Sequence, residues 1–225
     1  GTDATGDVIV ADWYVDPETG EGKPVTGIGD DAFNNNDNIT SVTIPDTITE
    51  IGDKAFYDAD NLKKVEIPNS VKGIGTQAFA ECDNLDKVTL PANDELEMKD
   101  KVFENSDKLK DLTFNGTKEE LSNFNDDNPS WYNGSAIDKV TCTGDGAGAG
   151  AGDYKLGGIK DDDGNFEKTW AELEKEGGLT ENDGVLTDAN GAAKNFVVDE
   201  RVTEIGDEAF KGNKDMTSVE IPESV

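Results

Sequence analysis

The sequence predicts a right-handed α/β solenoid, with a curved parallel sheet on one side, short helices or turns on the other, and irregular caps. Two observations lead to this fold class. The motif I-G-x-x-A-F occurs at 28–33, 51–56, 74–79 and 205–210, and the first three copies are 23 residues apart. An apolar triplet and a proline follow each copy, as in Leu62-x-x-Val65-x-Ile67-Pro68. Self-similarity at such a period is typical of repeat proteins rather than of an ordinary α/β domain.

Residues 51–73 serve as the repeating unit. Val65 and Ile67 alternate with charged residues, which predicts a short strand with one buried face. Pro68 cannot donate to a sheet ladder and therefore marks the end of the strand. Gly52 allows a sharp bend before the next segment, where a helical turn is expected. Each unit thus reads as a strand, a turn, a short helical segment and a return.

Stacking of units is needed to bury the apolar residues. One unit has too few apolar side chains for a core, and only 34% of the whole chain is hydrophobic. Stacked strands lie roughly 4.8 Å apart, so equivalent side chains form continuous columns. We therefore expect Phe33, Phe56 and Phe79 to form a column inside the solenoid.

The blocks I-T-x-I-G-x-x-A-F and L-x-x-V-x-I-P resemble the BspA-like class of leucine-rich repeats, which is found on bacterial and some protozoan cell surfaces. The resemblance covers roughly residues 25–115 and 196–225. Where the general leucine-rich pattern has Asn or Cys after the strand, this chain has Pro45, Pro68 and Pro91 nearby. The asparagine ladder of that pattern therefore cannot be assumed here.

The repeats are interrupted, which predicts several segments. The fourth unit is degenerate and follows the insertion-like Ala92-Asn93-Asp94-Glu95, and a Gly/Ala run later in the chain has the composition of a flexible linker. The expected segments are an N-terminal cap at 1–27, leucine-rich repeats at 28–116, an irregular C-terminal cap at 117–143, a Gly/Ala linker at 144–152, the leading helix and hairpin of a second module at 153–195, and the start of a second, truncated repeat array at 196–225.

The second module has its own local patterns. Phe166, Trp170 and Leu173 have amphipathic helical spacing, and Asn165 is a candidate N-cap. Turn signals predict a small hairpin around Val185-Leu186. The second array should expose core residues near Phe210 and Ile221 at its unfinished end, so end-to-end self-association through this repeat is expected.

The chain is strongly acidic, with a formal net charge of −30. Nucleic acid and anionic membrane surfaces are therefore poor partners, whereas cationic proteins or divalent cations suit this charge. The charge also suits the solubility of a secreted or surface protein. No apolar run approaches the ~20 residues of a membrane span, and no signal-peptide pattern is present, which fits a mature or trimmed chain. Together with the resemblance, the charge leads us to expect an extracellular or bacterial cell-surface location.

Few residues favour catalysis. The sequence contains no histidine, which removes the commonest general base and the usual metal and triad chemistries. Asp161-Asp162-Asp163-Gly164-Asn165 resembles part of a calcium loop, but its twelfth position would be Trp170, so a solvated turn is the better interpretation. Cys82 and Cys142 are expected to be separate structural thiols. We predict no catalytic, metal or cofactor-binding residues.

The outward positions of the predicted strands are the candidate binding site. They should form parallel columns along the concave face of the sheet, which is the usual binding face of solenoids. These residues are Ser41, Thr43, Lys64, Glu66, Lys87, Thr89, Asp111 and Thr113. The aromatic and arginine anchors of binding hot spots are missing from these positions, so a plain solvated face is the alternative.

The resemblance implies a non-catalytic binding module of a cell-surface protein, in adhesion to host proteins, host cells or other bacteria. The alternative is a structural spacer that presents another domain of a larger surface protein. An enzyme is disfavoured by the missing catalytic groups. The sequence does not identify the partner, which is an unknown protein or surface ligand of host or microbial origin.

Overall fold

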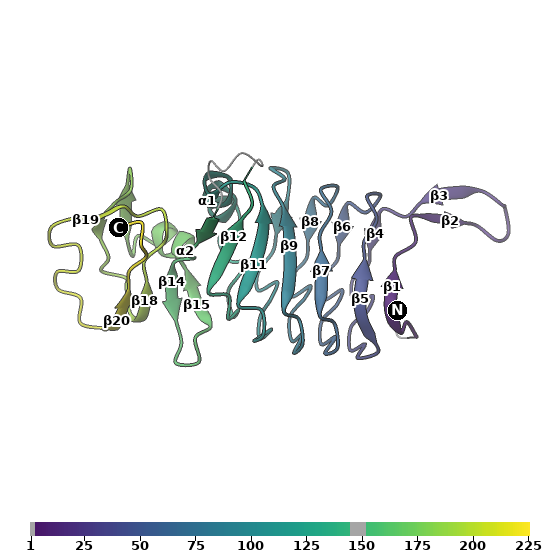
Figure 1. Cartoon of the computed structure of the whole chain (residues 1–225), viewed down its shortest axis with the longest axis horizontal. Helices are drawn as coiled ribbons and strands as arrows, with labels where there is room; N and C mark the ends of the chain where they lie inside the picture. The colour runs from purple at the N-terminus through teal and green to yellow at the C-terminus, as the bar shows by residue number, and fades with distance from the viewer. Residues whose placement is uncertain (1–2, 145–151) are drawn as a thin grey trace.

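The structure, a computed structural model, describes residues 3–144 and 152–225. Its strands lie side by side across an elongated molecule, with the two ends of the chain at opposite ends (Figure 1). The main sheet of the described residues has the order β1-β5-β7-β9-β11-β12-β13. Its strands are β1 (Gly6–Ile9), β5 (Ile39–Thr43), β7 (Lys64–Glu66), β9 (Lys87–Pro91), β11 (Asp111–Asn115), β12 (Lys139–Cys142) and β13 (Gly152–Tyr154). Neighbours are parallel except β12 and β13, which confirms the predicted solenoid.

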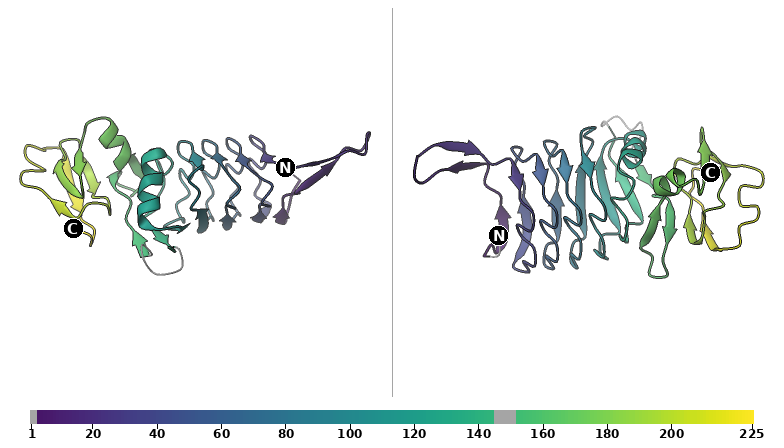
Figure 2. Two further views of the ribbon diagram at one scale, coloured as in Figure 1. Left: turned by 90° about the horizontal axis from the view of Figure 1, so that it is seen from above. Right: turned by 180° about the vertical axis from the view of Figure 1, so that it is seen from behind.

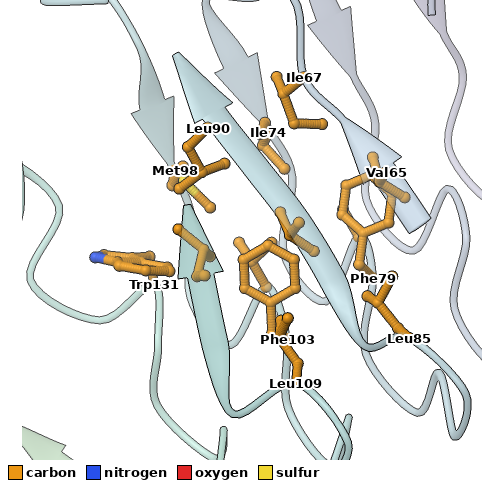
Figure 3. Packing of buried hydrophobic residues seen from close by; sticks show 14 of the residues in the cluster. Val65, Ile67, Ile74, Phe79, Leu85, Leu90, Met98, Phe103, Leu109 and Trp131 are labelled. Atoms are coloured by element: carbon orange, nitrogen blue, oxygen red, sulfur yellow. The ribbon is translucent and has the colours of Figure 1, made fainter. Parts of the chain in front are cut away.

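A second parallel sheet forms the opposite wall of each coil. It has the order β10-β8-β6-β4 among the described residues and comprises β4 (Gly27–Ile28), β6 (Glu50–Ile51), β8 (Gly73–Ile74) and β10 (Glu97–Met98). Figure 2 shows the coils from above, with the two rows of strands facing one another. The I-G pair of the repeated motif thus lies in or directly after this row of strands, and side chains from both rows, such as Leu90 and Met98, meet inside (Figure 3).

The strand register follows the sequence period. Ser41 pairs with Lys64, and Lys64 pairs with Lys87, so each step along the sheet is 23 residues. The next step, from Val88 to Leu112, is 24 residues, because the degenerate fourth unit carries an extra residue.

The predicted phenylalanine column is confirmed. The rings of Phe33 and Phe56 stack at 4.9 Å between centroids, and those of Phe56 and Phe79 at 5.1 Å. Phe103 continues the stack at 5.9 Å, and Trp131 then packs edge-on against Phe103. Phe33 is only half-buried, because it lies at the start of the column.

Turns, rather than helices, carry the A-F pair in each coil. In each of the first four coils two non-glycine residues adopt left-handed backbone angles, for example Lys54 (φ 54°) and Asp58 (φ 55°). Their equivalents recur one period away in Gln77 and Glu81. The backbone of these coils therefore turns at two points through left-handed residues, some of which are Asp or Asn, while others, such as Lys54, have little preference for this conformation.

The glycine of the I-G-x-x-A-F motif was predicted to allow a bend, but the structure shows a different role for it. A Cβ on Gly52 would lie 2.5 Å from the backbone nitrogen of Asp30, and a Cβ on Gly75 would lie 2.4 Å from that of Asp53. Glycine therefore allows neighbouring coils to approach closely at this point. The side chain of Asp30 accepts a hydrogen bond from the backbone N–H of Asp53 at 2.9 Å, which links the same two coils.

An asparagine ladder also links the coils, although the proline positions gave no reason to expect one. Asn61 donates to the backbone oxygen of Asp37, and Asn84 donates to that of Asp60, both at 2.7 Å. These asparagines precede the strands, so the ladder is on the opposite end of the strand from the prolines.

Helix α1 (Lys118–Asp127) follows the last regular strand. It begins with a capping box in which Thr117 and Glu120 bond to each other's backbone N–H groups. Residues of the expected cap, such as Trp131 and Ile137, are buried in the same core as the repeats. That core also includes Tyr154 and Phe166, so it extends beyond the cap segment.

The rest of the chain packs directly onto this end. β14 (Gly158–Lys160), β15 (Phe166–Thr169), β18 (Lys194–Val197) and β20 (Met216–Glu220) form a sheet in the order β15-β14-β18-β20. β16 (Thr180–Asn182), β17 (Val185–Asp188) and β19 (Glu204–Ile205) form another. The predicted hairpin is confirmed by the antiparallel pair β16–β17. Most of the predicted Gly/Ala linker, residues 145–151, lies outside the described residues.

The predicted start of the second helix was wrong. Phe166 belongs to strand β15, which pairs with β14, and helix α2 spans Trp170–Lys175. Thr169 rather than Asn165 is the N-cap, because its side chain accepts from the backbone N–H of Glu172. Strand pairing therefore overrides the helical spacing of the apolar residues at this position.

A hairpin of β2 (Trp13–Val15) and β3 (Gly22–Pro24) extends away from the N-terminal end of the solenoid (Figure 1). Trp13, Tyr14 and Val15 are more than half exposed on it. The sequence patterns had assigned this region only to an N-terminal cap.

Candidate functional site

The predicted outward positions lie together on one face of the main sheet. Val65 is buried on β7, whereas its neighbours Lys64 and Glu66 are exposed, because successive side chains in a strand point to opposite faces. We call the eight outward residues the sheet face. It has a first column of Ser41, Lys64, Lys87 and Asp111, and a second column of Thr43, Glu66, Thr89 and Thr113.

Three further charged residues extend these columns and were missed by the sequence prediction. Asp7 on β1 lies beside Ser41, and Lys139 on β12 lies beside Asp111. Asp153 on β13 faces Thr141 across the antiparallel pair. The alternation of polar and apolar residues around Asp7 and Lys139 is a signal that could have identified both strands, but neither carries the repeat motif.

Both ends of the sheet face are held by local hydrogen bonds and ion pairs. The carboxylate of Asp7 accepts from the hydroxyls of Ser41 at 2.6 Å and Thr40 at 3.1 Å, and these bonds lower the pKa of Asp7. The amine of Lys139 lies 2.9 Å from Asp153 and 3.7 Å from Asp111. The hydrogen bond to Asp153 is the main reason why the pKa of Lys139 is raised.

The centre of the sheet face is different. Lys64 and Lys87 lie directly opposite each other on neighbouring strands. In the part of the chain that the structure describes, neither ammonium group has an ion pair or a side-chain hydrogen bond, and the same is true of Glu66. Like charges that face each other across a strand pair are destabilising.

A shallow hollow of about 700 Å³ lies over this part of the sheet. Four sheet-face residues line it, together with residues of the loops that follow the strands. The sheet-face members are Ser41, Thr43, Lys64 and Glu66. The hollow can therefore present an amine and a carboxylate to a bound group, with hydroxyls beside them.

The acidic turn at Asp161 and the two cysteines, which were also candidates from the sequence, have structural roles. The carboxylate of Asp161 accepts from the backbone N–H groups of Asp163 and Asn165, both at 2.9 Å, and so stabilises its own turn. Cys82 and Cys142 are free and buried. Burial raises the pKa of Cys82 to about 12 and that of Cys142 to about 11, so both thiols are neutral at physiological pH.

The described residues hold neither a metal-binding cluster nor a membrane-spanning helix. They contain no cluster of three or more His, Cys, Asp or Glu side chains that could hold a metal ion. They also contain no helix that is long and apolar enough to cross a membrane. At the C-terminal end, Phe210 is half-buried and Ile221 is 50% exposed, and the predicted self-association through this region stays a prediction.

The stacked coils, each with one longer strand, a short opposite strand and a turn, define a leucine-rich repeat solenoid. The model of the BspA-type leucine-rich repeat region matches residues 22–128 and 189–225, with six copies. The chain belongs to this family. The family match includes the degenerate fourth unit as well as the regular ones.

Several solved structures are similar. A leucine-rich repeat protein from Bacteroides capillosus ATCC 29799 is 30% identical over 49% of this chain and 77% of that chain, with a TM-score of 0.44. A leucine-rich cell-surface protein from Faecalibacterium prausnitzii A2-165 is 21% identical over 97% of this chain and 64% of its own, with a TM-score of 0.40. The pneumococcal vaccine antigen PcpA is 17% identical over the whole chain and 56% of its own, with a TM-score of 0.41. No curated protein matches the chain.

Proposed function

We propose that this chain is a non-catalytic binding module of an extracellular or bacterial cell-surface protein, and that it contacts a partner protein through the sheet face. Membership of the BspA-type family supports the surface location, because repeats of this class are typical of bacterial surface proteins. The neutral, buried thiols and the absence of histidine from the sequence support a non-catalytic role.

The observation that carries the proposal is the pair Lys64 and Lys87. Like charges that face each other on neighbouring strands are unfavourable, and neither ammonium group has an ion pair with a carboxylate in the described structure. The rest of the chain is strongly acidic, so these lysines stand out as a local positive site. A carboxylate or another anionic group of a partner would relieve their repulsion on binding.

The physical character of such an interface follows from its residues. The sheet face has no aromatic or arginine anchor, so affinity depends on charge pairs and hydroxyl hydrogen bonds. Interactions between exposed charges are screened by salt, with a Debye length of about 8 Å at physiological ionic strength. Binding should therefore weaken clearly as the salt concentration rises.

A spacer is the second candidate function. The coils stack into an extended body with many links between neighbours, and this geometry would hold an attached domain at a distance (Figure 2). A spacer needs no particular charges on the sheet face, whereas a binding module does.

The test compares two double variants of the intact chain in binding to an immobilised host extracellular-matrix preparation and to whole bacterial cells. Lys64→Thr with Lys87→Thr removes the lysine pair. Lys23→Thr with Lys214→Thr removes the same charge from exposed sites outside the sheet face. We expect the first variant to bind about fivefold or more weakly, since each lost charge contact contributes up to about 1 kcal/mol. Equal binding by all three proteins would exclude the sheet face as the contact surface, and no binding by the unsubstituted chain would favour the spacer.

A further inference from the structure

A second hollow, of about 610 Å³, lies between segment 92–99 and helix α1. We call it the α1 pocket. Phe114 of β11 is one of its lining residues, and Ala92 lines both this pocket and the hollow over the sheet face. Its volume is in the range of pockets that bind small molecules or single side chains.

The α1 pocket exists because the repeat is interrupted at this place. The insertion-like segment beginning at Ala92 precedes β10, and the register from β9 to β11 is 24 residues instead of 23. Glycine at 116 lets the walls come together, since a Cβ there would lie 2.5 Å from the ring of Phe114 and 2.7 Å from the Cβ of Ala92.

Hydrogen bonds hold the two walls of the pocket in place. The side-chain oxygen of Asn128 accepts from the backbone N–H of Met98 at 2.6 Å. Its side-chain nitrogen donates to the backbone oxygen of Phe124 at 2.9 Å. Asn128 thus ties β10 to the end of α1, and the pocket is formed before any ligand arrives.

The innermost lining residues of the pocket are apolar. Leu96, Met98 and Phe124 line it while each being less than a tenth exposed. These residues can give apolar contact to an aliphatic stem, while polar and charged residues make up the rest of the lining.

The rim of the pocket is acidic, with Lys99 as the one cation among its lining residues. Three of the five carboxylates already have partners, since Glu95 pairs with Lys72, Glu97 pairs with Lys99, and Glu120 accepts from Thr117. The other two, Asp94 and Asp127, have no hydrogen bond or ion pair in the described structure.

Asp127 is moreover in an unfavourable position. It lies in the last turn of α1, where the helix dipole favours cations, and this turn holds no basic residue. Its neighbour Asp126 is compensated by Arg201 at 2.8 Å, but Asp127 is not. Asp127 is therefore an exposed carboxylate without a stabilising partner in the described structure.

We propose that the α1 pocket binds a lysine or arginine side chain of a partner protein. The aliphatic stem would lie on Leu96, Met98 and Phe124, and the cation would reach the carboxylates of Asp94 and Asp127. Long cationic side chains combine an apolar stem with a charged end, which matches a pocket lined by buried apolar residues and by unpaired carboxylates. The site has the opposite charge preference to the lysine pair and does not depend on the function proposed for the sheet face.

The probes for a test are N-acetyl-L-arginine amide and its neutral analogue N-acetyl-L-citrulline amide. Each is titrated into the isotopically labelled, intact chain and followed by the backbone amide shifts of Met98 and Asn128. We expect the arginine probe to shift these amides with millimolar affinity and the citrulline probe to bind about threefold to fivefold more weakly, as expected for one or two exposed charge contacts.

Matched variants locate the site. Asp127→Asn should weaken binding of the arginine probe by about threefold to fivefold, because it removes one exposed charge contact. Glu66→Gln removes the same charge from the sheet face and should leave binding unchanged. Equal affinity for both probes, shifts spread over the acidic surface, or an unchanged affinity in Asp127→Asn would each overturn the proposal. None of these outcomes depends on whether Lys64 and Lys87 bind a partner.

Discussion

The guanidinium of Arg201, the sequence's single arginine, lies 3.0 Å from the fully buried carboxylate of Asp199. The same carboxylate accepts from the hydroxyl of Tyr154 at 2.5 Å and from the backbone N–H of Gly157 at 2.9 Å. Arg201 also reaches Asp126 on α1 at 2.8 Å. The C-terminal part is thereby fixed to the helix that follows the repeats.

Removal of Arg201 should lower stability strongly. Burial by itself lowers the pKa of Arg201, but Asp199 and the other nearby groups outweigh it and raise this pKa above its usual value. Arg201→Met leaves Asp199 buried without its cation, which costs about 3 kcal/mol or more in the free energy of unfolding. Asp126→Asn changes only a half-exposed partner and should cost about 1 kcal/mol or less. Urea unfolding followed by tryptophan fluorescence measures both, and equal losses would contradict the central role of Asp199.

A substitution in the middle of the phenylalanine column should lower the free energy of unfolding more than one at its end. Phe56 is fully buried between two rings, so Phe56→Ala should lower the free energy of unfolding by about 3–5 kcal/mol. Phe33 stacks on one side only and is half-buried, so Phe33→Ala should cost clearly less. Thermal unfolding of the two variants gives the comparison. A larger effect at Phe33 would mean that the column does not act as a continuous core.

Replacing a residue that has a left-handed backbone conformation by glycine should stabilise the folded chain. Lys54 has φ of 54°, a conformation that costs an L-residue about 1 kcal/mol and glycine little. Lys54→Gly should therefore raise the free energy of unfolding, by up to about 1 kcal/mol. Lys63 is also exposed but does not have a positive φ, so Lys63→Gly is the control and should lower stability. The idea fails if both substitutions destabilise the chain equally in urea.

The two thiols should be inert in the folded chain. At pH 8, a disulfide reagent such as DTNB should modify neither cysteine until the protein is unfolded, because burial keeps both thiols protonated. Rapid modification of the native protein would show that one thiol is accessible.

The same burial predicts a pH dependence of stability. The unfolded chain loses a thiol proton above about pH 8.5, whereas folded Cys82 keeps it up to a pKa of about 12. The folded state therefore binds more protons in this interval, and the free energy of unfolding falls as the pH rises through it. Cys82→Ser should remove this contribution, which the difference between the two pH profiles measures.

The repeat positions could be predicted because equal spacing places equal side chains above one another. The register of Lys64 with Lys87 and the stack of Phe56 on Phe79 follow directly from the 23-residue period. The asparagine ladder and the close approach at Gly52 were not foreseen. Both depend on the distance between coils, which the sequence pattern does not contain.

The repeat pattern could not predict the junction with the C-terminal part, for another reason. The pairing of β12 with β13 and the contact of Arg201 with Asp126 join segments that share no repeat spacing. The alternation in the strands was enough to place the sheet-face residues on one side. Which of those residues have partners depends on Asp7, Lys139 and Asp153, and these lie outside the repeat motif.

The direction of the strands has a mechanical consequence. Because the strands run across the long axis, the hydrogen bonds between coils lie nearly along it (Figure 1). A pulling force applied to the two ends would load the bonds of one coil at a time and peel the coils off in sequence, rather than shear many bonds together. Each released coil would lengthen the chain by roughly 70–80 Å, from 23 residues at about 3.3 Å each. The molecule would then act as an extensible tether under force.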